Sequence, residues 1–327
     1  MIRDDEQLAL AALANLAPSV HNIQPARFRF DGPQTITLME DPTRRLFVGD
    51  PSGADNLKSL GAALEGLAIA LSLRGLGVAM KPAEREHEVA RLDVLSGAEP
   101  DALAPLVATR ASYRGVFAAR SDADHRAIAS VGERCPDLWF VEKPDAIAAL
   151  SKLYDRVNLE VVRNADYRAE LLSWMRLSRK DPRYLRDGLN AEQMALSPFE
   201  ATAAGLVLGG GFGVLNAVGL AGPLLSEGSR TKSAAALALF HRPSDEPELE
   251  TGRRFYRVWL EIERAGLSLC PMSVLADVPH AAQTLLSEAG IAGGRKLVTV
   301  FRIGRRPPSA PRLPRARLPA SELIRTP

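Results

Sequence analysis

The sequence predicts an α+β fold made of two related units in one chain. Amphipathic helix patterns alternate with short strand patterns along most of the length. The second half then runs through the same kinds of elements as the first half, in the same order. We therefore expect a first, degenerate unit over residues 1–100 and a second unit over residues 101–327.

The first unit is expected to begin with a helix and a pair of strands. Residues 5–16 place apolar side chains along one helical face, and Pro18 stops this helix. Residues 26–30 and 35–39 have strand patterns. The residues between these strands, Asp31-Gly32-Pro33, supply the turn of a hairpin.

A long helix and a closing strand are expected in each half. In the first half they span residues 56–74, where leucines recur at spacings of four, three and four, and residues 88–95. In the second half a strand at 138–141, a helix at 252–264 and a strand at 296–303 repeat this order. After each long helix a glycine precedes a proline by the same interval, as in Gly77 and Pro82, then Gly266 and Pro271.

Residues 164–230 have no counterpart in the first half. Their stretch at 201–226 is uncharged and long enough to cross a bilayer, but its seven glycines and the lack of a flanking basic cluster favour a buried or covering segment. Insertions of this kind usually lie at the surface or over a site. We predict a helical lid here, with three candidate substrate contacts, Trp174, Arg176 and Tyr184.

The composition excludes several classes of protein. The chain has 327 residues, 41 basic and 39 acidic side chains and a net charge of +2, so nucleic acid is not an expected partner. Its two cysteines are too few for a disulfide framework or a structural zinc site. The acidic N-terminus lacks the profile of a signal peptide. We expect a cytoplasmic protein without a metal.

A polar loop follows the first helix. It runs from Pro18 to Pro25 and includes Ser19, Val20, Asn22 and Gln24. Side chains of these types on a loop held by two prolines can hydrogen-bond the edge of a flat heterocycle. A cap-and-turn segment without a ligand fits the same residues, and both interpretations stay open on this pattern.

Basic side chains flank a hydroxyl in the segment after the first unit. In an extended conformation Arg110, Ser112 and Arg114 point to one side, and two guanidiniums around a hydroxyl suit a phosphate dianion. The C-terminal arm at residues 305–327, which is dense in proline and arginine, adds Arg312, Arg315 and Arg317. A solvated basic loop and a solvated tail are the competing interpretations.

A fourth candidate segment follows the second long helix. Pro271, Met272 and Ser273 could present backbone N–H groups to a ligand, although an ordinary helix-to-strand connection fits them as well. Other known motifs are missing. The glycine run at 209–213 is not a G-x-G-x-x-G fingerprint, and there is no Walker A, H-E-x-x-H or G-x-S-x-G sequence. A Rossmann nicotinamide site and hydrolytic triads are therefore not supported.

These motifs together resemble the nitroreductase superfamily. Residues 18–28 are similar to its flavin loop, P-S-x-x-N-x-Q-P-W-x-F, with Ala26 where tryptophan is usual. Residues 110–114 resemble its R-x-S-x-R/K phosphate grip, and residues 315–319 resemble its C-terminal basic pair. Residues 271–274 resemble the segment whose backbone N–H approaches flavin N5. The resemblance covers nearly the whole chain except residues 164–230.

The closest resemblance is to the Acg-like branch, in which two nitroreductase units are fused and a lid lies over the flavin. It implies two pseudo-symmetric units, each a small, mainly antiparallel sheet with flanking helices. The first half of this chain has the loop without a preceding grip, and the second half has the grip without the loop. The two halves are complementary, so we expect one FMN per chain.

The resemblance implies an FMN-dependent oxidoreductase that passes electrons through flavin N5 to a small organic acceptor, with NADH or NADPH as a transient donor. No catalytic side chain is needed, because the flavin carries the redox chemistry. Two alternatives stay open: a flavin-sequestering protein with little turnover, and a flavin-dependent dehydrogenase of a biosynthetic intermediate. We expect a monomer, since internal pairing removes the usual need for a homodimer.

Overall fold

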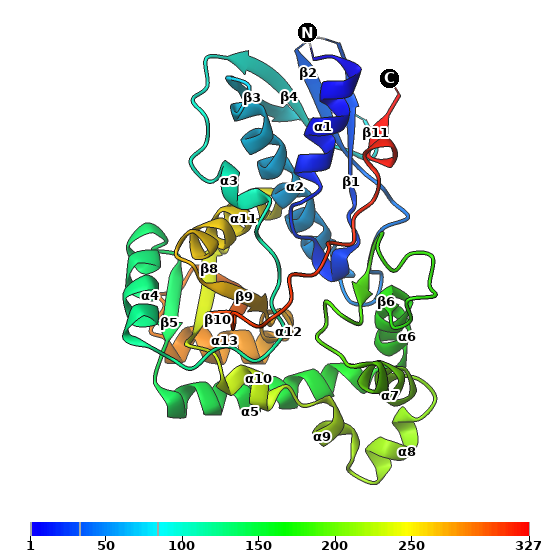
Figure 1. Cartoon of the computed structure of the whole chain (residues 1–327), viewed down its shortest axis with the longest axis vertical. Coiled ribbons are helices and arrows are strands. Elements are labelled where there is room, and N and C mark those ends of the chain that lie inside the picture. The colour runs from blue at the N-terminus through cyan, green and yellow to red at the C-terminus, as the bar shows by residue number, and fades with distance from the viewer. Residues whose placement is uncertain (1, 33, 84, 327) are drawn as a thin grey trace.

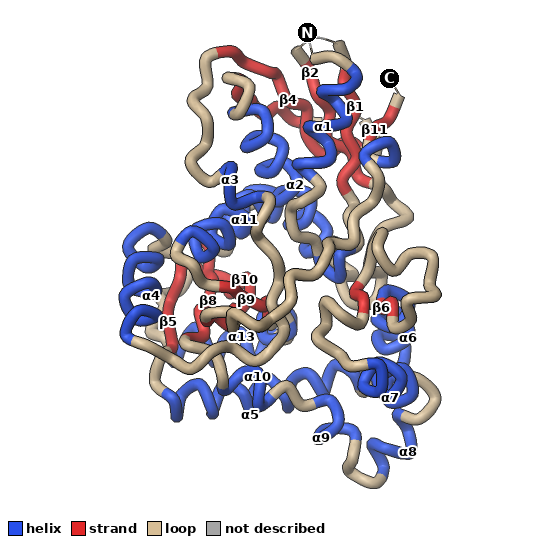
Figure 2. The backbone as a smooth tube through the Cα atoms, viewed as in Figure 1, coloured by secondary structure: helices blue, strands red, loops and turns tan. Residues whose placement is uncertain are grey.

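Two sheets and two long helices between them form a mixed α+β fold in the computed structural model, which describes residues 2–32, 34–83 and 85–326 (Figures 1 and 2). One helix covers a face of each sheet, and these two helices contact each other. The expected α+β class is confirmed. The predicted hairpin turn includes Pro33, which lies outside the described residues.

The first sheet has the strand order β11-β1-β2-β4-β3. Its four sequential strands pair antiparallel, and the C-terminal strand β11 pairs parallel with β1. The strands are β1 (Ala26–Phe30), β2 (Thr35–Glu40), β3 (Leu76–Pro82), β4 (Glu88–Ser96) and β11 (Ile324–Arg325). Helices α1 (Asp4–Ala14) and α2 (Ala54–Ser72) pack against this sheet, and their apolar side chains form its core.

The second sheet has the order β5-β8-β10-β9 and is antiparallel throughout. Its strands are β5 (Leu138–Val141), β8 (Ala236–Pro243), β9 (Ser268–Pro271) and β10 (Arg295–Gly304). In both sheets the first strand along the chain pairs with the second, the second with the fourth, and the fourth with the third. A long helix connects the second and third strands in each case, namely α2 and α11 (Glu248–Arg264).

Other helices cover the second sheet and link the parts of the chain. One face packs with α4 (Asp122–Arg134) and α11, and the opposite face packs with α5 (Pro144–Val162), α12 (Val274–Asp277) and α13 (Pro279–Glu288). Shorter helical turns are η1 (Val20–Asn22), α3 (Ala104–Val107) and η2 (Ala320–Glu322). From β10 the tail crosses back along α1 to the first sheet, where it ends in β11 (Figure 1).

Helices α2 and α11 meet at two glycines. A Cβ atom added at Gly61 would lie 2.0 Å from the carbonyl oxygen of Leu249, and one added at Gly252 would lie 2.0 Å from the carbonyl oxygen of Lys58. Each glycine thus contacts the backbone of the other helix three residues before the partner glycine. Only residues without a Cβ permit this approach.

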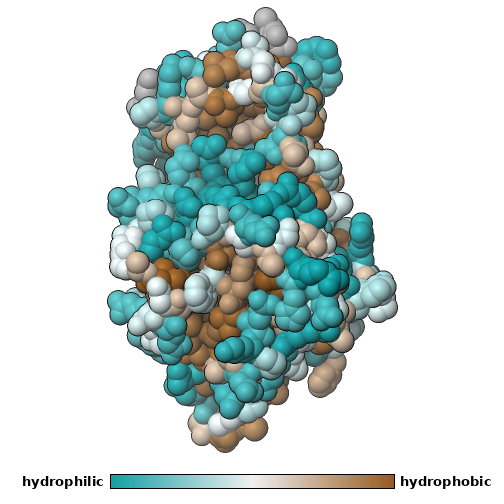
Figure 3. All heavy atoms as spheres, turned by 90° about the vertical axis from the view of Figure 1, so that its left-hand side faces the viewer, coloured by the Kyte–Doolittle hydropathy of each residue, from teal (hydrophilic) through white to brown (hydrophobic). Residues whose placement is uncertain are grey.

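The segment without a counterpart in the first half forms small helices and two short strands. They are α6 (Ala165–Trp174), β6 (Met175–Arg176), β7 (Leu189–Asn190), α7 (Pro198–Leu208), α8 (Phe212–Ala217), α9 (Ala221–Leu225) and α10 (Gly228–Lys232). Large apolar side chains on α7 to α9 are exposed, including Phe199 at 82% and Val214 at 69%. Figure 3 shows hydrophobic surface at the lower end of the molecule, at the height of α8 and α9 in Figure 1. In the described part of the chain, no helix has the length and apolar character needed to cross a bilayer.

The sequence patterns missed four strands of the two sheets, β3, β8, β9 and β11. Strand β3 contains a glycine and ends on a proline, and it lies at the edge of its sheet, where a proline costs no ladder hydrogen bond. Strand β8 begins with buried alanines and leucines on both faces, so it lacks the alternation of a half-buried strand. The predicted helix at 5–16 ends earlier, at Ala14, and Gly77 lies inside β3.

Candidate functional site

The loop from Pro18 to Gln24 is held in a restrained conformation beside α2. His21, Asn22 and Gln24 have φ values of 43°, 56° and 53°, a left-handed region that costs energy for residues with a side chain. Hydrogen bonds fix it: Gln24 N donates to Ser19 Oγ (3.0 Å), and Val20 N donates to Ser59 Oγ of α2 (3.0 Å). Such strain persists only where the surroundings specify the conformation.

The amides of Asn22 and Gln24 join this loop to distant segments. Asn22 Nδ2 donates to the carbonyl oxygens of Gly188 and Ala316, both at 3.1 Å. Gln24 Nε2 donates to the carbonyl oxygen of Arg186 (2.8 Å), and Gln24 Oε1 accepts from Leu318 N (2.8 Å). The two predicted ligand contacts therefore also fasten the inserted segment and the tail to the loop.

Three of the predicted arginines come together next to this loop. Arg110 Nη2 donates to the carbonyl oxygen of Leu16 (2.6 Å), and its guanidinium lies 4.6 Å from the ring centre of Trp259. Arg317 Nη1 donates to Asn22 Oδ1 (2.7 Å), and Arg315 Nη2 donates to the carbonyl oxygen of Ala108 (2.8 Å). The charge of Arg110 lowers the pKa of both Arg315 and Arg317, and the charge of Arg315 lowers the pKa of Arg317, as expected for guanidiniums that lie close together.

The carboxylate of Glu263 lies near the three-arginine cluster and acts to raise the pKa values of Arg110 and Arg315, but it does not pair with either. Among the residues that the structure describes, none of Arg110, Arg315 and Arg317 forms an ion pair. One nitrogen of each is buried without a hydrogen-bond partner: Arg110 Nε, Arg315 Nη1 and Arg317 Nε. Buried donors of this kind cost free energy unless they are paired.

Burial and mutual repulsion shift the pKa values of this cluster. Burial, then the charges of Arg110 and Arg315, lower the pKa of Arg317 to about 9. Burial and the charge of Arg110 lower the pKa of Arg315 to about 10, and burial lowers the pKa of Arg110. An anion bound here would relieve this repulsion and pair the free donors.

The other predicted grip residues lie around this cluster. Ser112 forms an isolated parallel bridge with Leu269 of β9, so its segment runs beside that strand. Arg114 Nη1 donates to the carbonyl oxygen of Gln193 (3.2 Å). Ser112 thus lies beside the strand that leads to residues 271–273, and Arg114 lies against the inserted segment.

The fourth predicted segment begins at the end of β9. Pro271 closes this strand, and the buried Met272 donates its N–H to the carbonyl oxygen of Val300 (2.7 Å). Ser273 is the N-cap residue of α12, and its carbonyl oxygen accepts from Ala276 N (2.7 Å). The structure therefore fixes Pro271 to Ser273 through backbone bonds, directly beside β10.

The predicted substrate contacts Trp174, Arg176 and Tyr184 are buried or bonded to other residues of the inserted segment. Arg176 is 1% exposed and forms an ion pair with Asp187 (2.7 Å), and its guanidinium lies 5.7 Å from the ring centre of Trp174. Tyr184 is buried. Asp187 also pairs with Arg44 of the first half (3.1 Å), so this set holds the inserted segment against the loop that follows β2.

Two aromatic residues and one backbone segment of this site were missed by the sequence analysis. Tyr256 and Trp259 of α11 face Arg110, and the Tyr256 hydroxyl is buried without a partner. Their spacing of three places them on one helical face, which a helix pattern alone assigns to the core. Residues 184–193 contact the loop through backbone groups. Such contacts do not depend on side-chain type, so no sequence motif indicates them.

His21 is part of the loop and lies near several charged side chains. Burial, together with the charge of Arg114, lowers its pKa to about 4, while Asp55 and Glu170 act in the opposite direction. Its Nδ1 atom is buried without a partner. The imidazole is therefore neutral near pH 7.

The low pKa of His21 predicts a specific pH dependence of stability. The unfolded chain takes up a proton near pH 6.5 and the folded chain only near pH 4, so the free energy of unfolding falls as the pH drops between these values. In His21→Asn, the free energy of unfolding should fall by about 2 kcal/mol less over this pH range than in the unaltered protein. The measurement is denaturant unfolding of both proteins at about pH 7 and about pH 4.5. An equal stability difference at the two pH values would contradict the assignment.

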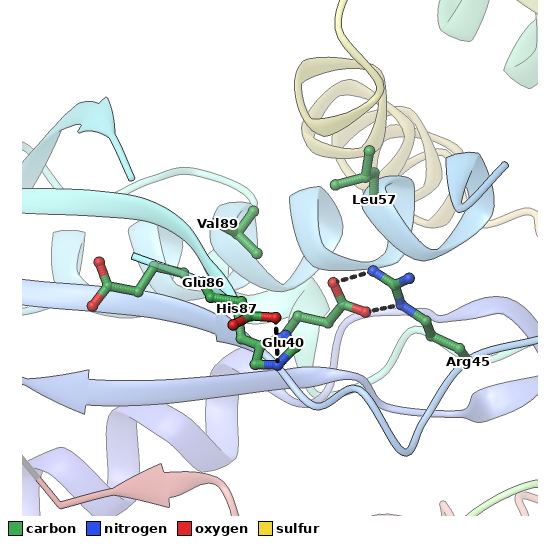
Figure 4. Close-up of a pocket in the computed structure, with 7 residues that line it drawn as sticks. Glu40, Arg45, Leu57, Glu86, His87 and Val89 are labelled. Carbon is green, nitrogen blue, oxygen red and sulfur yellow. Dashed lines mark hydrogen bonds and ion pairs between the residues drawn. The ribbon is translucent and has the colours of Figure 1, made fainter. Parts of the chain in front are cut away.

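A separate pocket lies away from these residues. It has a volume of about 500 Å³ and is lined by Glu40, Arg45, Leu57, Glu86, His87, Glu88 and Val89. Figure 4 shows the Glu40 and Arg45 side chains paired across one side of it. Its charged groups come from β2, β4 and the loops beside them, and none of the predicted site residues lines it.

In the described chain, no group of three or more His, Cys, Asp or Glu side chains is arranged to hold a metal ion.

Comparison with known proteins gives weak structural likenesses. No family model matches the chain, and no curated protein matches it by sequence. A variant of the FMN and NADPH-dependent nitroreductase of sphigopyxis sp. strain HMH is 19% identical, covering 69% of this chain and 98% of its own, with a TM-score of 0.40. The FMN-dependent nitroreductase of Mycobacterium smegmatis in complex with NADPH is 17% identical, covering 67% and 95%, with a TM-score of 0.37. The nitroreductase with bound FMN of Bacteroides fragilis is 11% identical, covering 65% and 92%, with a TM-score of 0.35.

Proposed function

We propose that the chain binds FMN and acts as a nitroreductase-like oxidoreductase. The observation that carries this proposal is the cluster of Arg110, Arg315 and Arg317 beside the loop at residues 18–24. Arg110 is buried and the other two are half-buried, none forms an ion pair among the described residues, and each keeps an unpaired buried donor. The phosphate of FMN is a dianion with several acceptor oxygens, so it suits this donor set.

The residues around the cluster define where the rest of the cofactor would lie. The polar loop with Pro18, Ser19 and Val20 and the segment at residues 271–273 are proposed to flank the flavin ring, with Arg114 supplying positive charge nearby. FMN, when bound, supplies hydride and electron transfer between NADH or NADPH and a small organic acceptor. The chain's own part is to position the cofactor and to exclude water, and Asn22 and Gln24 do this by fixing the loop.

We further propose that the two sheets belong to two fused, pseudo-symmetric nitroreductase-like units of the Acg type, over residues 1–100 and 101–327. Apart from the added strand β11, the strands of the two sheets follow the same order, and this supports the proposal, as does the reciprocal contact of Gly61 and Gly252. The loop comes from the first unit and Arg110 from the second. One cofactor site per chain follows, and a monomer would be sufficient to form it.

The test is the absorbance spectrum of the purified protein and its ratio of FMN to chain. We expect a yellow protein, or one that becomes yellow on addition of FMN, with one FMN per chain. Excess phosphate should compete with FMN, because both would use the same three arginines. A colourless protein that does not bind added FMN would overturn this proposal.

A flavin-sequestering protein with little turnover is the second candidate. The inserted segment favours it, because residues 184–193 bond directly to the loop and to the tail, through Gly188 N to Asn22 O (3.2 Å) and Gln193 Nε2 to Pro314 O (2.9 Å). Stopped-flow mixing of the FMN-loaded protein with NADH and with NADPH separates the two. Rapid loss of the visible flavin absorbance indicates an oxidoreductase, and no change with either donor indicates sequestration.

A further inference from the structure

A carboxylate from the inserted segment fills a set of three backbone amides in the loop after β2. Glu170 of α6 accepts from Phe47 N (2.6 Å) and Val48 N (3.1 Å) through Oε1. It accepts from Val48 N (3.2 Å) and Gly49 N (2.7 Å) through Oε2. Three consecutive N–H groups of one loop therefore converge on one carboxylate, the arrangement by which backbone concavities bind anions.

No side chain of the loop takes part in this recognition. The donors are all backbone amides, and among the described residues no basic side chain lies within ion-pair distance of Glu170. The loop therefore recognises the carboxylate group itself and not the chain that carries it. Any carboxylate that reaches the three amides could form the same bonds.

The contact lies at the surface and its partner helix is loosely held. Phe47 is 69% exposed and Val48 is 39% exposed. None of the residues of α6 is buried, and only some of its apolar side chains, such as Tyr167 and Leu171, pack against the small cluster of the inserted segment. The apolar packing of α6 lies within the inserted segment, so little of it would be lost if Glu170 left the amides. These hydrogen bonds contribute much of the contact between α6 and residues 47–49, and the ion pair of Asp187 with Arg44 attaches the same segment separately.

We propose that the amides of Phe47, Val48 and Gly49 form a binding site for small organic carboxylates, which Glu170 occupies in this structure. A carboxylate ligand would displace Glu170 and release α6 from the loop at residues 47–49. The exposed side chains of Phe47 and Val48 and the Tyr167 ring, which a Cβ at Gly49 would meet at 3.4 Å, favour ligands with an apolar body. Aromatic acids have this combination.

The site lies beside the candidate cofactor loop but does not depend on it. Arg44, which precedes these amides in the chain, donates to the carbonyl oxygen of Ile23 (2.9 Å). The negative charge of Glu170 acts to raise the pKa of His21 in the cofactor loop. Release of α6 would therefore uncover a surface next to this loop. The proposal concerns the amides and Glu170 alone, so experiments without flavin test it whether or not the chain binds FMN.

Chemical rescue of an emptied site provides the test. In Glu170→Ala, the amides of residues 47–49 lose their acceptor, and their hydrogen exchange is expected to become at least about tenfold faster. Sodium acetate should restore protection of these three amides, and sodium chloride at equal ionic strength should not. In the unaltered protein, sodium benzoate should speed exchange in residues 165–174 while residues 47–49 stay protected.

Glu133→Ala, which removes an exposed glutamate from α4, is the matched control and should show neither the loss of protection nor the rescue. If acetate leaves the amides of Glu170→Ala unprotected, or if chloride restores them equally, the proposal is wrong. Glu170→Gln keeps the size of the side chain and serves if the alanine variant does not fold. Benzoate should then release α6 at a concentration about tenfold lower than in the unaltered protein, and an unchanged concentration would also refute the site.

Discussion

Removing one guanidinium from the three-arginine cluster is expected to weaken FMN binding by about ten- to a hundredfold, because a charge-assisted hydrogen bond to phosphate contributes about 1.5–3 kcal/mol. Arg315→Gln is the cleanest change, since the hydrogen bonds of Arg315 within the described residues go to the backbone carbonyl oxygens of Val107 and Ala108. Fluorescence titration of the ligand-free protein with FMN measures the affinity.

The same substitution should not destabilise the ligand-free chain. Arg315 and Arg110 lower the pKa of Arg317, so removing one charge relieves repulsion, and the free energy of unfolding without FMN should stay constant or rise. Arg312→Gln, on the same tail but exposed, is the matched control and should leave FMN binding unchanged. Equal affinities for all three proteins would rule out the cluster as the phosphate site.

The second large effect is expected from adding a methyl group where α2 and α11 meet. In Gly61→Ala or Gly252→Ala, the new Cβ would overlap a backbone carbonyl oxygen at 2.0 Å, and backbone atoms of two packed helices cannot move aside independently. We expect the free energy of unfolding to fall by about 3 kcal/mol or more. Denaturant titration followed by circular dichroism measures it.

Gly213→Ala provides the control for this effect. Nothing lies within 4 Å of a Cβ at Gly213, which is in helix α8, so alanine should leave stability unchanged or raise it by about 0.5–1 kcal/mol. If Gly61→Ala were as stable as Gly213→Ala, the two long helices would not meet as closely as described.

The elements with clear periodicity were predicted well. The leucine spacing placed the long helix of the first half at residues 56–74, and α2 spans Ala54–Ser72. Residues 26–30 and 138–141 match β1 and β5. Strands β3 and β8 were missed because an edge strand with proline and a strand buried on both faces lack the alternation on which such predictions depend.

The sequence indicated which chain segments form the candidate site, but not which side-chain contacts they make. Loop, grip and tail were all indicated by residue type, and the structure brings Asn22, Arg110 and Arg317 together. That Asn22 and Gln24 bond to the chain itself, and that Arg114 bonds to Gln193, follows from tertiary packing that no local pattern contains. Their roles toward a ligand stay predictions.

The hydrogen bond between Arg317 and Asn22 joins residues 295 positions apart along the chain. A contact of such separation closes a very long loop, and the entropy of that closure is lost before the contact contributes any stability. The three-arginine cluster is therefore expected to form late in folding, after both sheets exist. A partly folded chain would have the strands and helices but no phosphate site, so competence to bind the cofactor would report complete folding.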